Sequence, residues 1–331
     1  MSAKTIAIVG ATGNQGKVVI DRLLQNATTK DQLKIRALTR DSKSSKSKTL
    51  EARGAGRIGI VDADVNNKAS LEAALAGADY VFANLNSYLD MDGEVQQGKN
   101  VVDAAKGNNV KLFIWSTLPS FAAFTKGRYT NVRHAENKIQ VQEYLATSGV
   151  AWVGASTSFF SDNFLWPNYV SLGEGGSYSV SSGTMEPDVK LPMTWLEKDL
   201  GPFVAALIEA HLKGDKSAPQ NKAVVVAGFH ASLRDVAAEL SEQTGRPAKA
   251  VAGTDAGSVE LAEMFSSYND FGFYEGEEIP SSFVRENGIE HSTLREFVKG
   301  ALVPALESRS HIEGSLSEPK TVSSSTTWQK L

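Results

Sequence analysis

The sequence predicts an α/β protein in which a doubly wound parallel sheet is joined to a smaller α+β portion. In the first half, short apolar runs alternate with segments of helical spacing. Right-handed crossovers turn such a series into a parallel sheet covered on both faces. The first apolar run ends in a glycine-rich turn that leads directly into a helix. After Ser156 the regular alternation stops, which predicts that the rest of the chain is built differently.

The elements of the first half follow from the apolar spacing and from the residues that break it. The expected strands cover residues 5–10, 33–39, 58–61, 80–83, 111–116 and 151–155. The expected helices cover residues 15–25, 70–76, 94–106 and 133–147.

The second half has weaker patterns. Residues 171–183 are rich in Gly and Ser, which is typical of a loop or an exposed hairpin. Ser232 is expected to cap a helix over residues 233–244. Further helices are expected over 200–212 and 293–306, and strands over 223–227 and 248–251.

These elements predict a division of the chain. Residues 1–155 would form the first domain, and residues 156–308 a smaller portion that is partly interleaved with it. The polar residues 309–331 would form a flexible tail. A single large α/β domain is the alternative.

Composition excludes several classes of site. The 331-residue chain has a net charge of −4 and no cysteine, so disulfides, cysteine-ligated metals and a thiol nucleophile are excluded. A mildly acidic chain without a basic block is a poor candidate for binding nucleic acid. His211, His230, His291 and His311 lack the spacing of a metal site, so no metal is expected.

The amino terminus runs directly into a strand and lacks the features of a signal peptide. No run approaches the roughly 18 apolar residues that a membrane span needs. These features predict a cytosolic protein, with the nucleus as the alternative, and no membrane partner.

The turn after the first strand reads Gly10-Ala-Thr-Gly13-Asn-Gln-Gly16. Gly10 permits a tight turn, Gly13 lets a pyrophosphate approach the backbone, and Gly16 lets the helix pack closely on the strand. The pyrophosphate would lie at the positive end of the helix dipole. Because the turn follows a strand and opens a helix, it predicts a dinucleotide-binding Rossmann domain. A glycine turn without a ligand is the alternative.

The second strand leads to Arg40, near the position where NAD-binding proteins usually carry a carboxylate. The planar donors of arginine suit a 2′-phosphate, and Lys43, Lys46 and Lys48 raise the local potential. We therefore predict NADP(H) as the cofactor. Two alternatives stay open: Asp41 would lie near the ribose if the alignment shifted by one residue, and the lysines could belong to a solvated loop.

The chain resembles the NmrA-like family, an atypical branch of the short-chain dehydrogenase/reductase superfamily. The branch includes NADPH-sensing proteins and quinone or aromatic-ether reductases. The resemblance spans roughly residues 4 to 300. It rests on Gly10–Gly16, Thr39-Arg40, Asp62-Ala-Asp64, Glu94–Lys99, Trp115–Thr117, His134–Lys138 and Thr157–Phe164.

The resemblance implies a set of cofactor contacts. Arg40 would meet the 2′-phosphate and Asp64 the adenine, whereas Asn84 and Lys138 would meet the nicotinamide ribose. From its place after the third strand alone, Asp64 could equally cap the following helix. The residues implied around the pyrophosphate are Gly10, Thr12, Gly13, Asn14, Gln15 and Gly16.

The resemblance also defines the candidate catalytic residues. In the superfamily, a tyrosine four residues before a lysine exchanges a proton with the substrate while hydride passes to carbon. A serine at the end of the fifth strand polarises the substrate carbonyl. Here Ser116 and Lys138 occupy the serine and lysine positions, but His134 stands in place of the tyrosine. His134 is one helical turn from Lys138 and could donate a proton near neutral pH. Alternatively, His134 is only a polar residue at the edge of the cleft, and the chain binds the dinucleotide without turnover. Tyr129 is a weaker substitute donor, because the residue four positions after it is Arg133 and not a lysine.

Three functions remain open, of which we favour the first. The first is an NADPH-dependent reductase of a small carbonyl, quinone or enone. The second is a redox-sensing regulator that controls a protein partner, with residues 86–93 and 122–130 as the moving loops. The third is a scaffold protein with a relic cofactor site. For all three functions, we expect the protein to be a monomer or a homodimer. Six aromatic side chains of the second half are expected either to line a pocket for a planar substrate or to pack in the core: Phe159, Phe160, Phe164, Trp166, Tyr169 and Trp195.

Overall fold

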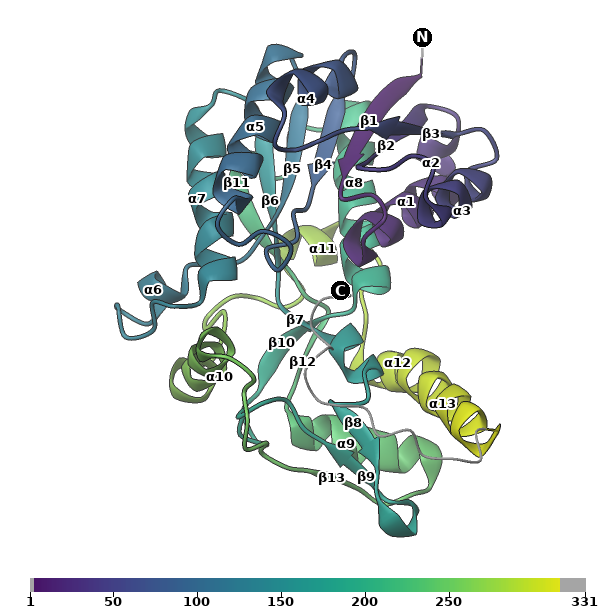
Figure 1. The fold of residues 1–331 in the computed structure, drawn as a ribbon, viewed down its shortest axis with the longest axis vertical. Helices are drawn as coiled ribbons and strands as arrows, with labels where there is room; N and C mark the ends of the chain where they lie inside the picture. The colour runs from purple at the N-terminus through teal and green to yellow at the C-terminus, as the bar shows by residue number, and fades with distance from the viewer. Residues whose placement is uncertain (1–2, 316–331) are drawn as a thin grey trace.

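The computed structural model describes residues 3–315, and within them a large parallel sheet organises the upper part of the molecule (Figure 1). Its strand order is β11-β6-β5-β4-β1-β2-β3, and every pairing between neighbours is parallel. The order reverses between β1 and β4, which is where open α/β sheets bind ligands. This arrangement confirms the predicted fold class. The strands are β1 (Lys4–Val9), β2 (Leu33–Thr39), β3 (Ile58–Asp62), β4 (Tyr80–Ala83), β5 (Leu112–Thr117), β6 (Trp152–Thr157) and β11 (Lys222–Val226).

Helices cover both faces of this sheet (Figure 1). One face packs against α1 (Asn14–Gln25), α3 (Ser45–Arg53) and α8 (Gly201–Lys213). The other packs against α4 (Lys68–Leu75), α5 (Glu94–Gly107) and α7 (Arg133–Thr147). The central strands are therefore mostly apolar, as expected for a sheet buried on both sides. The short helices α2 (Ala27–Lys30) and α6 (Phe121–Phe124) complete this part of the chain.

The smaller portion lies beyond the carboxyl ends of the strands (Figure 1). Its sheets are β12-β10-β7 and β13-β9-β8. The Gly- and Ser-rich segment forms the antiparallel pair β8 and β9, which confirms the hairpin alternative. The strands are β7 (Phe159–Phe160), β8 (Val170–Leu172), β9 (Tyr178–Val180), β10 (Leu191–Thr194), β12 (Phe229–Ala231) and β13 (Ala248–Ala250).

Most helices of the second half pack on these sheets and on each other, but Leu196, Leu200 and Val284 join the core against α1 and α8 instead. Ser232 caps α9 by accepting the N–H of Asp235, as the sequence predicts. The other helical segments include η1 (Ser161–Leu165), η2 (Glu174–Gly176) and the π turns η3 (Leu196–Leu200) and η4 (Val298–Leu302). The α-helices are α9 (Leu233–Thr244), α10 (Val259–Phe271), α11 (Ser282–Glu286), α12 (Leu294–Phe297) and α13 (Val303–Ser315).

The two portions exchange elements. The core against α1 and β1 includes residues of α8 and β11, which come from the second half of the chain. Conversely, Phe121, Val132 and Ala135 pack into the aromatic core of the smaller portion. At the far end, α13 is helical up to Ser315. The remainder of the predicted tail, residues 316–331, lies outside the described residues.

Two helices near the site have no counterpart among the predicted elements. Residues 45–53, where a lysine-rich solvated loop was an open alternative, form α3, which is capped by Ser44 and buries little more than Leu50. Such a helix lacks the apolar stripe on which the sequence prediction relies. The second is α10, whose amino terminus is capped by Ser258. No helix within residues 3–315 has both the length and the apolar character that a membrane span requires.

Candidate functional site

A cavity of about 1310 Å³ lies at the carboxyl ends of the parallel strands, between the sheet and the smaller portion. Gly16 and Asp64 are not among its lining residues. The cavity brings together ten of the predicted site residues: Gly10, Thr12, Gly13, Asn14, Gln15, Arg40, Asn84, Ser116, His134 and Lys138.

The glycine turn is packed closely on one side and open on the other. Gly10 has φ +77°, and a Cβ there would lie 2.4 Å from the carbonyl oxygen of Asn84. A Cβ on Gly16 would lie 2.4 Å from the carbonyl oxygen of Gly10, so Gly16 permits the close approach of α1 to the turn. A Cβ on Gly13 would meet only the Gly10 oxygen, at 3.3 Å. Gly13 caps α1 without a side-chain acceptor, so the N–H groups of the first turn are available to an anion.

The end of β2 supplies cations to the cavity. Arg40 is exposed, and within residues 3–315 its side chain has no hydrogen bond or ion pair. Lys46, at the start of α3, lines the same wall. The carboxylate of Asp41 accepts the N–H of Lys43 at 2.9 Å, and its carbonyl accepts the hydroxyl of Ser47. Asp41 therefore shapes the turn into α3.

Asp64 has a local structural role. Its carboxylate accepts the N–H of Asn66 at 2.9 Å, and its own N–H donates to the hydroxyl of Ser70. These bonds turn the chain from β3 into α4 and direct the carboxylate to the backbone. The neighbouring Val65 and Asn66 line the cavity, and the adenine contact at Asp64 stays a prediction.

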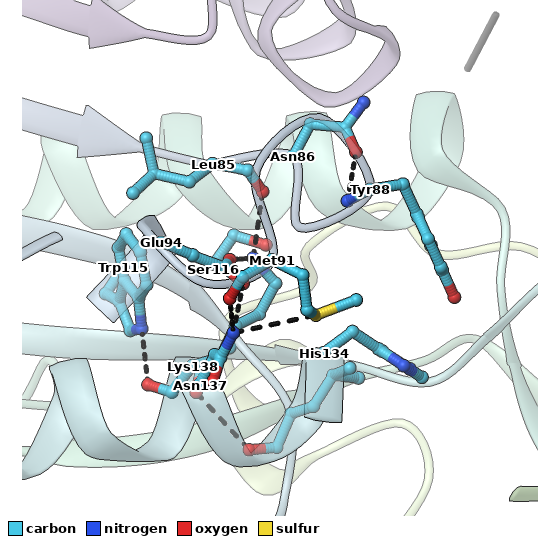
Figure 2. Close-up of polar contacts among 12 residues, drawn as sticks. Leu85, Asn86, Tyr88, Met91, Glu94, Trp115, Ser116, His134, Asn137 and Lys138 are labelled. Carbon is cyan, nitrogen blue, oxygen red and sulfur yellow. Dashed lines mark hydrogen bonds and ion pairs between the residues drawn. The ribbon is translucent and has the colours of Figure 1, made fainter. Parts of the chain in front are cut away.

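Lys138 is buried and paired with Glu94 (Figure 2). Its Nζ donates to Glu94 Oε1 at 3.0 Å and to the carbonyl oxygen of Leu85 at 2.9 Å. The side chains of Lys138 and Glu94 are 9% and 0% exposed. The Lys138 ammonium also lies 5.3 Å from the ring centroid of Trp115. Two of its three N–H donors are thus engaged, which leaves one for a molecule in the cavity.

Glu94 was not among the predicted site residues. It lies in the first turn of α5, where a glutamate ordinarily indicates only a favourable helix start. A second oxygen of its carboxylate accepts from Asn137 Nδ2 at 3.3 Å. The pairing brings together residues 44 positions apart, so no local sequence pattern could have shown it.

Two further polar groups face this part of the cavity. The Oδ1 atom of Asn84 is buried without a hydrogen-bond partner among the described residues, so it can accept from a hydroxyl group of a bound molecule. Ser116 is 1% exposed, and its hydroxyl donates to Gln15 Oε1 at 2.6 Å. Because that bond uses the only proton of the hydroxyl, Ser116 faces the cavity as an acceptor, which differs from the carbonyl-polarising role expected of it.

His134 forms a close contact with a carboxylate of the smaller portion. Its Nδ1 lies 2.5 Å from Oε1 of Glu260, and its backbone N–H donates to the same oxygen at 2.8 Å. Burial acts to raise the pKa of Glu260, but the hydrogen bonds and charge of His134, together with Arg133, outweigh it and hold that pKa below its usual range. The ring centroids of Tyr88 and His134 are 5.8 Å apart (Figure 2).

Tyr129, the other candidate donor, lies outside the cavity lining. Its hydroxyl donates to Asp270 at 2.6 Å. That hydrogen bond raises the pKa of Tyr129, because the proton is held by the carboxylate. Among residues 3–315, no group of three His, Asp or Glu side chains is arranged to hold a metal ion.

The far end of the cavity is aromatic. Phe159, Phe160, Trp166 and Tyr169 line it, whereas Phe164 and Trp195 belong to the core of the smaller portion. Helix α10 adds side chains that the sequence analysis did not include: Leu261, Met264 and Tyr268.

One acidic side chain lies among these rings. Asp162 lines the cavity and accepts the N–H of Leu196 at 3.1 Å. Burial raises the pKa of Asp162 to about 6.

Comparisons with known proteins show what the chain is similar to. An NmrA-like family domain-containing oxidoreductase of Penicillium ochrochloron is 30% identical over 200 residues, which cover 58% of this chain and 56% of that protein. Quinone oxidoreductase 2 of Escherichia coli is 27% identical over 248 residues, covering 73% and 75%. The solved structure of NmrA, a negative transcriptional regulator, in complex with NADP has a TM-score of 0.76 at 21% identity, covering 96% of this chain and 100% of that one.

The extent of these matches differs. The alignments with four fungal relatives span only 43% to 65% of the lengths of those proteins. The NmrA-like family as a whole matches residues 2–299, which include both the parallel sheet and the smaller portion. The chain therefore belongs to the NmrA-like family.

Proposed function

We propose that this protein is an NADP(H)-dependent oxidoreductase that reduces a small carbonyl, quinone or enone. The observation that carries the proposal is the continuous cavity. It runs from the glycine turn of β1–α1 to an aromatic end, with Lys138 and His134 among its lining residues. When bound, NADPH supplies the hydride for such a reduction. The aromatic end suits a planar, largely apolar acceptor.

The residues of the cavity fit this cofactor. Gly13 and the uncapped first turn of α1 suit the pyrophosphate. Arg40 and Lys46 suit the 2′-phosphate. The unpaired Oδ1 of Asn84 and the remaining donor of Lys138 suit the hydroxyl groups of a ribose. The predicted set of cofactor contacts is kept in this proposal. Asp64 in addition accepts the N–H of Asn66, which lines the cavity.

The chain supplies two candidate proton-carrying groups. Lys138 is fixed by Glu94, so its role in the proposal is to hold the ribose and contribute positive charge. His134 has one ring nitrogen bonded to Glu260 and the other available for proton exchange. Ser116 would accept a hydrogen bond from the cofactor or substrate.

The test is a reduction assay with purified protein, NADPH or NADH, and a panel of quinones, aldehydes and enones. We expect acceptor-dependent loss of NADPH absorbance that exceeds the rate with NADH. A titration calorimetry arm measures NADPH binding separately. Binding without oxidation by any acceptor would contradict the enzymatic proposal and favour the alternative below.

The alternative is a redox-sensing regulator that binds NADP(H) without turnover. It is favoured by the histidine at the position of the superfamily's tyrosine, and by the similarity to NmrA, whose solved structure is that of a negative transcriptional regulator. A sensor requires two conformations with different cofactor affinity. Limited proteolysis should then cut residues 86–93 or 122–130 at different rates with NADP+ and NADPH, whereas identical digestion patterns would count against it.

A further inference from the structure

We propose that Glu260 is a positioning residue for His134, and that this histidine–carboxylate pair provides the proton donor in place of the missing tyrosine. The inference rests on the proposed reductase function and deepens it. It assigns a role to α10, a helix outside the Rossmann elements that approaches the site from the smaller portion (Figure 1).

The geometry fixes the imidazole ring in one orientation. The same oxygen of Glu260 contacts Nδ1 of His134 at 2.5 Å and its backbone N–H at 2.8 Å. A carboxylate only accepts, so Nδ1 must carry a proton. Nε2 is then the one ring nitrogen that can exchange a proton with a bound molecule. The two side chains are only 13% and 17% exposed, which limits competition from water.

Helix α10 is held in place by more than this contact. Glu263 accepts from the backbone N–H of Asn131 at 2.8 Å and from its side-chain amide. Asp270 accepts from the hydroxyl of Tyr129 at 2.6 Å and pairs with Arg128. All three carboxylates of α10 thus bind the segment before α7 or the first turn of α7. The same helix presents apolar side chains to the cavity, so the element that supports His134 also builds the substrate end.

The charged groups around the pair are themselves matched. On α7, Arg133 pairs with Asp92 of the β4–α5 loop, and Lys138 pairs with Glu94 of α5. Within residues 3–315, Glu260 is therefore the carboxylate that contacts the imidazole.

Tyrosine side chains complete the surroundings of the pair. Tyr88 faces the ring from the β4–α5 loop, Tyr268 lies on α10, and Tyr169 lines the cavity. Burial raises the pKa of Tyr169 and Tyr268, so these two stay neutral in the physiological range.

The proposed step balances without a further reactant. Hydride adds to the substrate carbon, and the electron pair of the C=O π bond moves to oxygen. That oxygen takes the proton from Nε2 of the doubly protonated His134 ring. The neutral ring keeps its proton on Nδ1, where it is hydrogen-bonded to Glu260, and a proton from the solvent restores the charged form. Glu260 stabilises the charged ring throughout and does not itself lose or gain a proton.

The experiment compares Glu260→Gln with Glu263→Gln. Glutamine at 260 can still accept both N–H groups but lacks the charge, so α10 should stay docked. Glu263→Gln makes the same change one turn along α10, at a contact to Asn131. We expect kcat with an aldehyde to fall roughly 10- to 1000-fold in Glu260→Gln, with little change in KM. Glu263→Gln should stay within a factor of about three, and Glu260→Asp should recover part of the loss.

A second acceptor separates proton donation from positioning of the helix. A preformed iminium cation needs hydride alone, because its nitrogen becomes neutral without a proton. Glu260→Gln and His134→Gln should therefore slow aldehyde reduction much more than iminium reduction. Equal losses with both acceptors, or equal losses in Glu260→Gln and Glu263→Gln, would overturn the inference.

A spectroscopic measurement decides the pairing independently of turnover. In ¹⁵N-histidine-labelled protein, with His134→Gln used to assign the signal, we expect protonated Nδ1 and a neutral form that lacks the proton on Nε2. Neutral His134 with the proton on Nε2 would overturn the pairing even in an active enzyme. If no acceptor is reduced but Nδ1 is protonated, the reductase function fails while the histidine–carboxylate pairing stands.

Discussion

Lys138 and Glu94 show how strongly one buried pair can constrain a site. Both side chains are removed from water, and each meets most of its hydrogen-bonding needs through the other and through Leu85 and Asn137. A buried ion pair gains little over an apolar pair of equal volume, but the loss of one partner leaves an uncompensated charge. We therefore infer that the main role of the pair is to hold the Lys138 ammonium at the cavity, and that its contribution to stability is secondary.

The first prediction follows from this asymmetry. Glu94→Leu should lower the free energy of unfolding by about 3–5 kcal/mol, because Lys138 is left buried and unpaired. The double variant Glu94→Leu/Lys138→Met should recover much of that loss while it loses NADPH affinity. Urea unfolding and calorimetry measure the two effects. A single variant as stable as the wild type would contradict the interpretation.

The second prediction concerns cofactor choice at Arg40. Arg40→Gln removes a guanidinium with no partner in the described part of the chain. Loss of a charged hydrogen bond to the 2′-phosphate should weaken NADPH binding by about 1.5–3 kcal/mol, and leave NADH binding nearly unchanged. Lys48→Gln is the matched control, since Lys48 carries the same charge outside the cavity lining. Equal effects of both variants on NADPH affinity in a calorimetric titration would refute a specific contact.

The third prediction uses the pH dependence of Asp162. Burial raises the pKa of Asp162 from 3.8 to about 6, so between these values the folded protein holds a proton that the unfolded chain releases. This contribution stabilises the protein at low pH and is lost as pH rises through that window. Asp162→Asn should therefore gain stability over the wild type, by on the order of 1–3 kcal/mol, as pH rises from about 4 to 7.

The measurement for Asp162 is urea unfolding across that pH range. Asp188→Asn is the control. Asp188 is paired with Arg234, and their hydrogen bond holds the pKa of Asp188 below its usual range. Asp188→Asn should show no gain as pH rises. If the difference in unfolding free energy between Asp162→Asn and the wild type does not change with pH, the raised pKa of Asp162 is contradicted.

At the scale of elements, the glycine turn separates folding from binding. A Cβ on Gly16 would press on backbone atoms of Gly10 and Ala11 at 2.4 and 2.7 Å, which cannot move aside easily. Gly13 has φ −80° and open space beyond a single 3.3 Å contact. A substitution at Gly16 should therefore disturb the packing of the turn, whereas a substitution at Gly13 should change only the surface that the turn presents to the cavity.

The fourth prediction compares these two positions. Gly16→Ala should reduce the free energy of unfolding by about 1–3 kcal/mol through overpacking. Gly13→Ala should change stability much less, but its methyl group occupies the space assigned to the pyrophosphate and should reduce NADPH affinity at least about tenfold. Urea unfolding of the cofactor-free protein and calorimetry give the two quantities. The reverse order of effects would contradict the packing argument.

Element prediction succeeded where the pattern was local and failed where burial came from elsewhere. The ranges for β2, β4 and α7 match the structure residue for residue. Helix α10 was not predicted, although Leu261, Met264, Phe265 and Tyr268 have helical spacing after the cap at Ser258. Its polar face carries the carboxylates that bind the loop between α6 and α7 and the first turn of α7. The strands β7 and β12 are too short for any period to be recognised.

At the scale of the whole molecule, the parallel sheet depends on the second half of the chain. β11 pairs with β6 along its whole length, and α8 packs on α1 with Phe203, Val204, Leu207 and Ile208 fully buried. The predicted boundary at residue 155 therefore marks a change of sequence pattern, while α8 and β11 from the second half complete the packing of the large sheet.

The fifth prediction tests this dependence. The fragment 1–155 would expose the free edge of β6 and the apolar face of α1 that α8 covers. We expect it to lack a cooperative urea transition and to bind no NADPH, whereas residues 1–315 should retain both. Circular dichroism and calorimetry provide the comparison. Cooperative unfolding of the fragment would show that the first half folds alone.

Local sequence patterns were sufficient to predict the Rossmann sheet and its glycine turn, because the apolar period, the breaking residues and a strand–glycine–helix order act over a few neighbouring residues. The sequence also identified the family and the absence of the usual tyrosine before Lys138. Only the tertiary structure decided the partners of the site residues. Glu94 meets Lys138 across 44 positions and Glu260 meets His134 across 126. Such contacts depend on how whole helices pack, which no local pattern records.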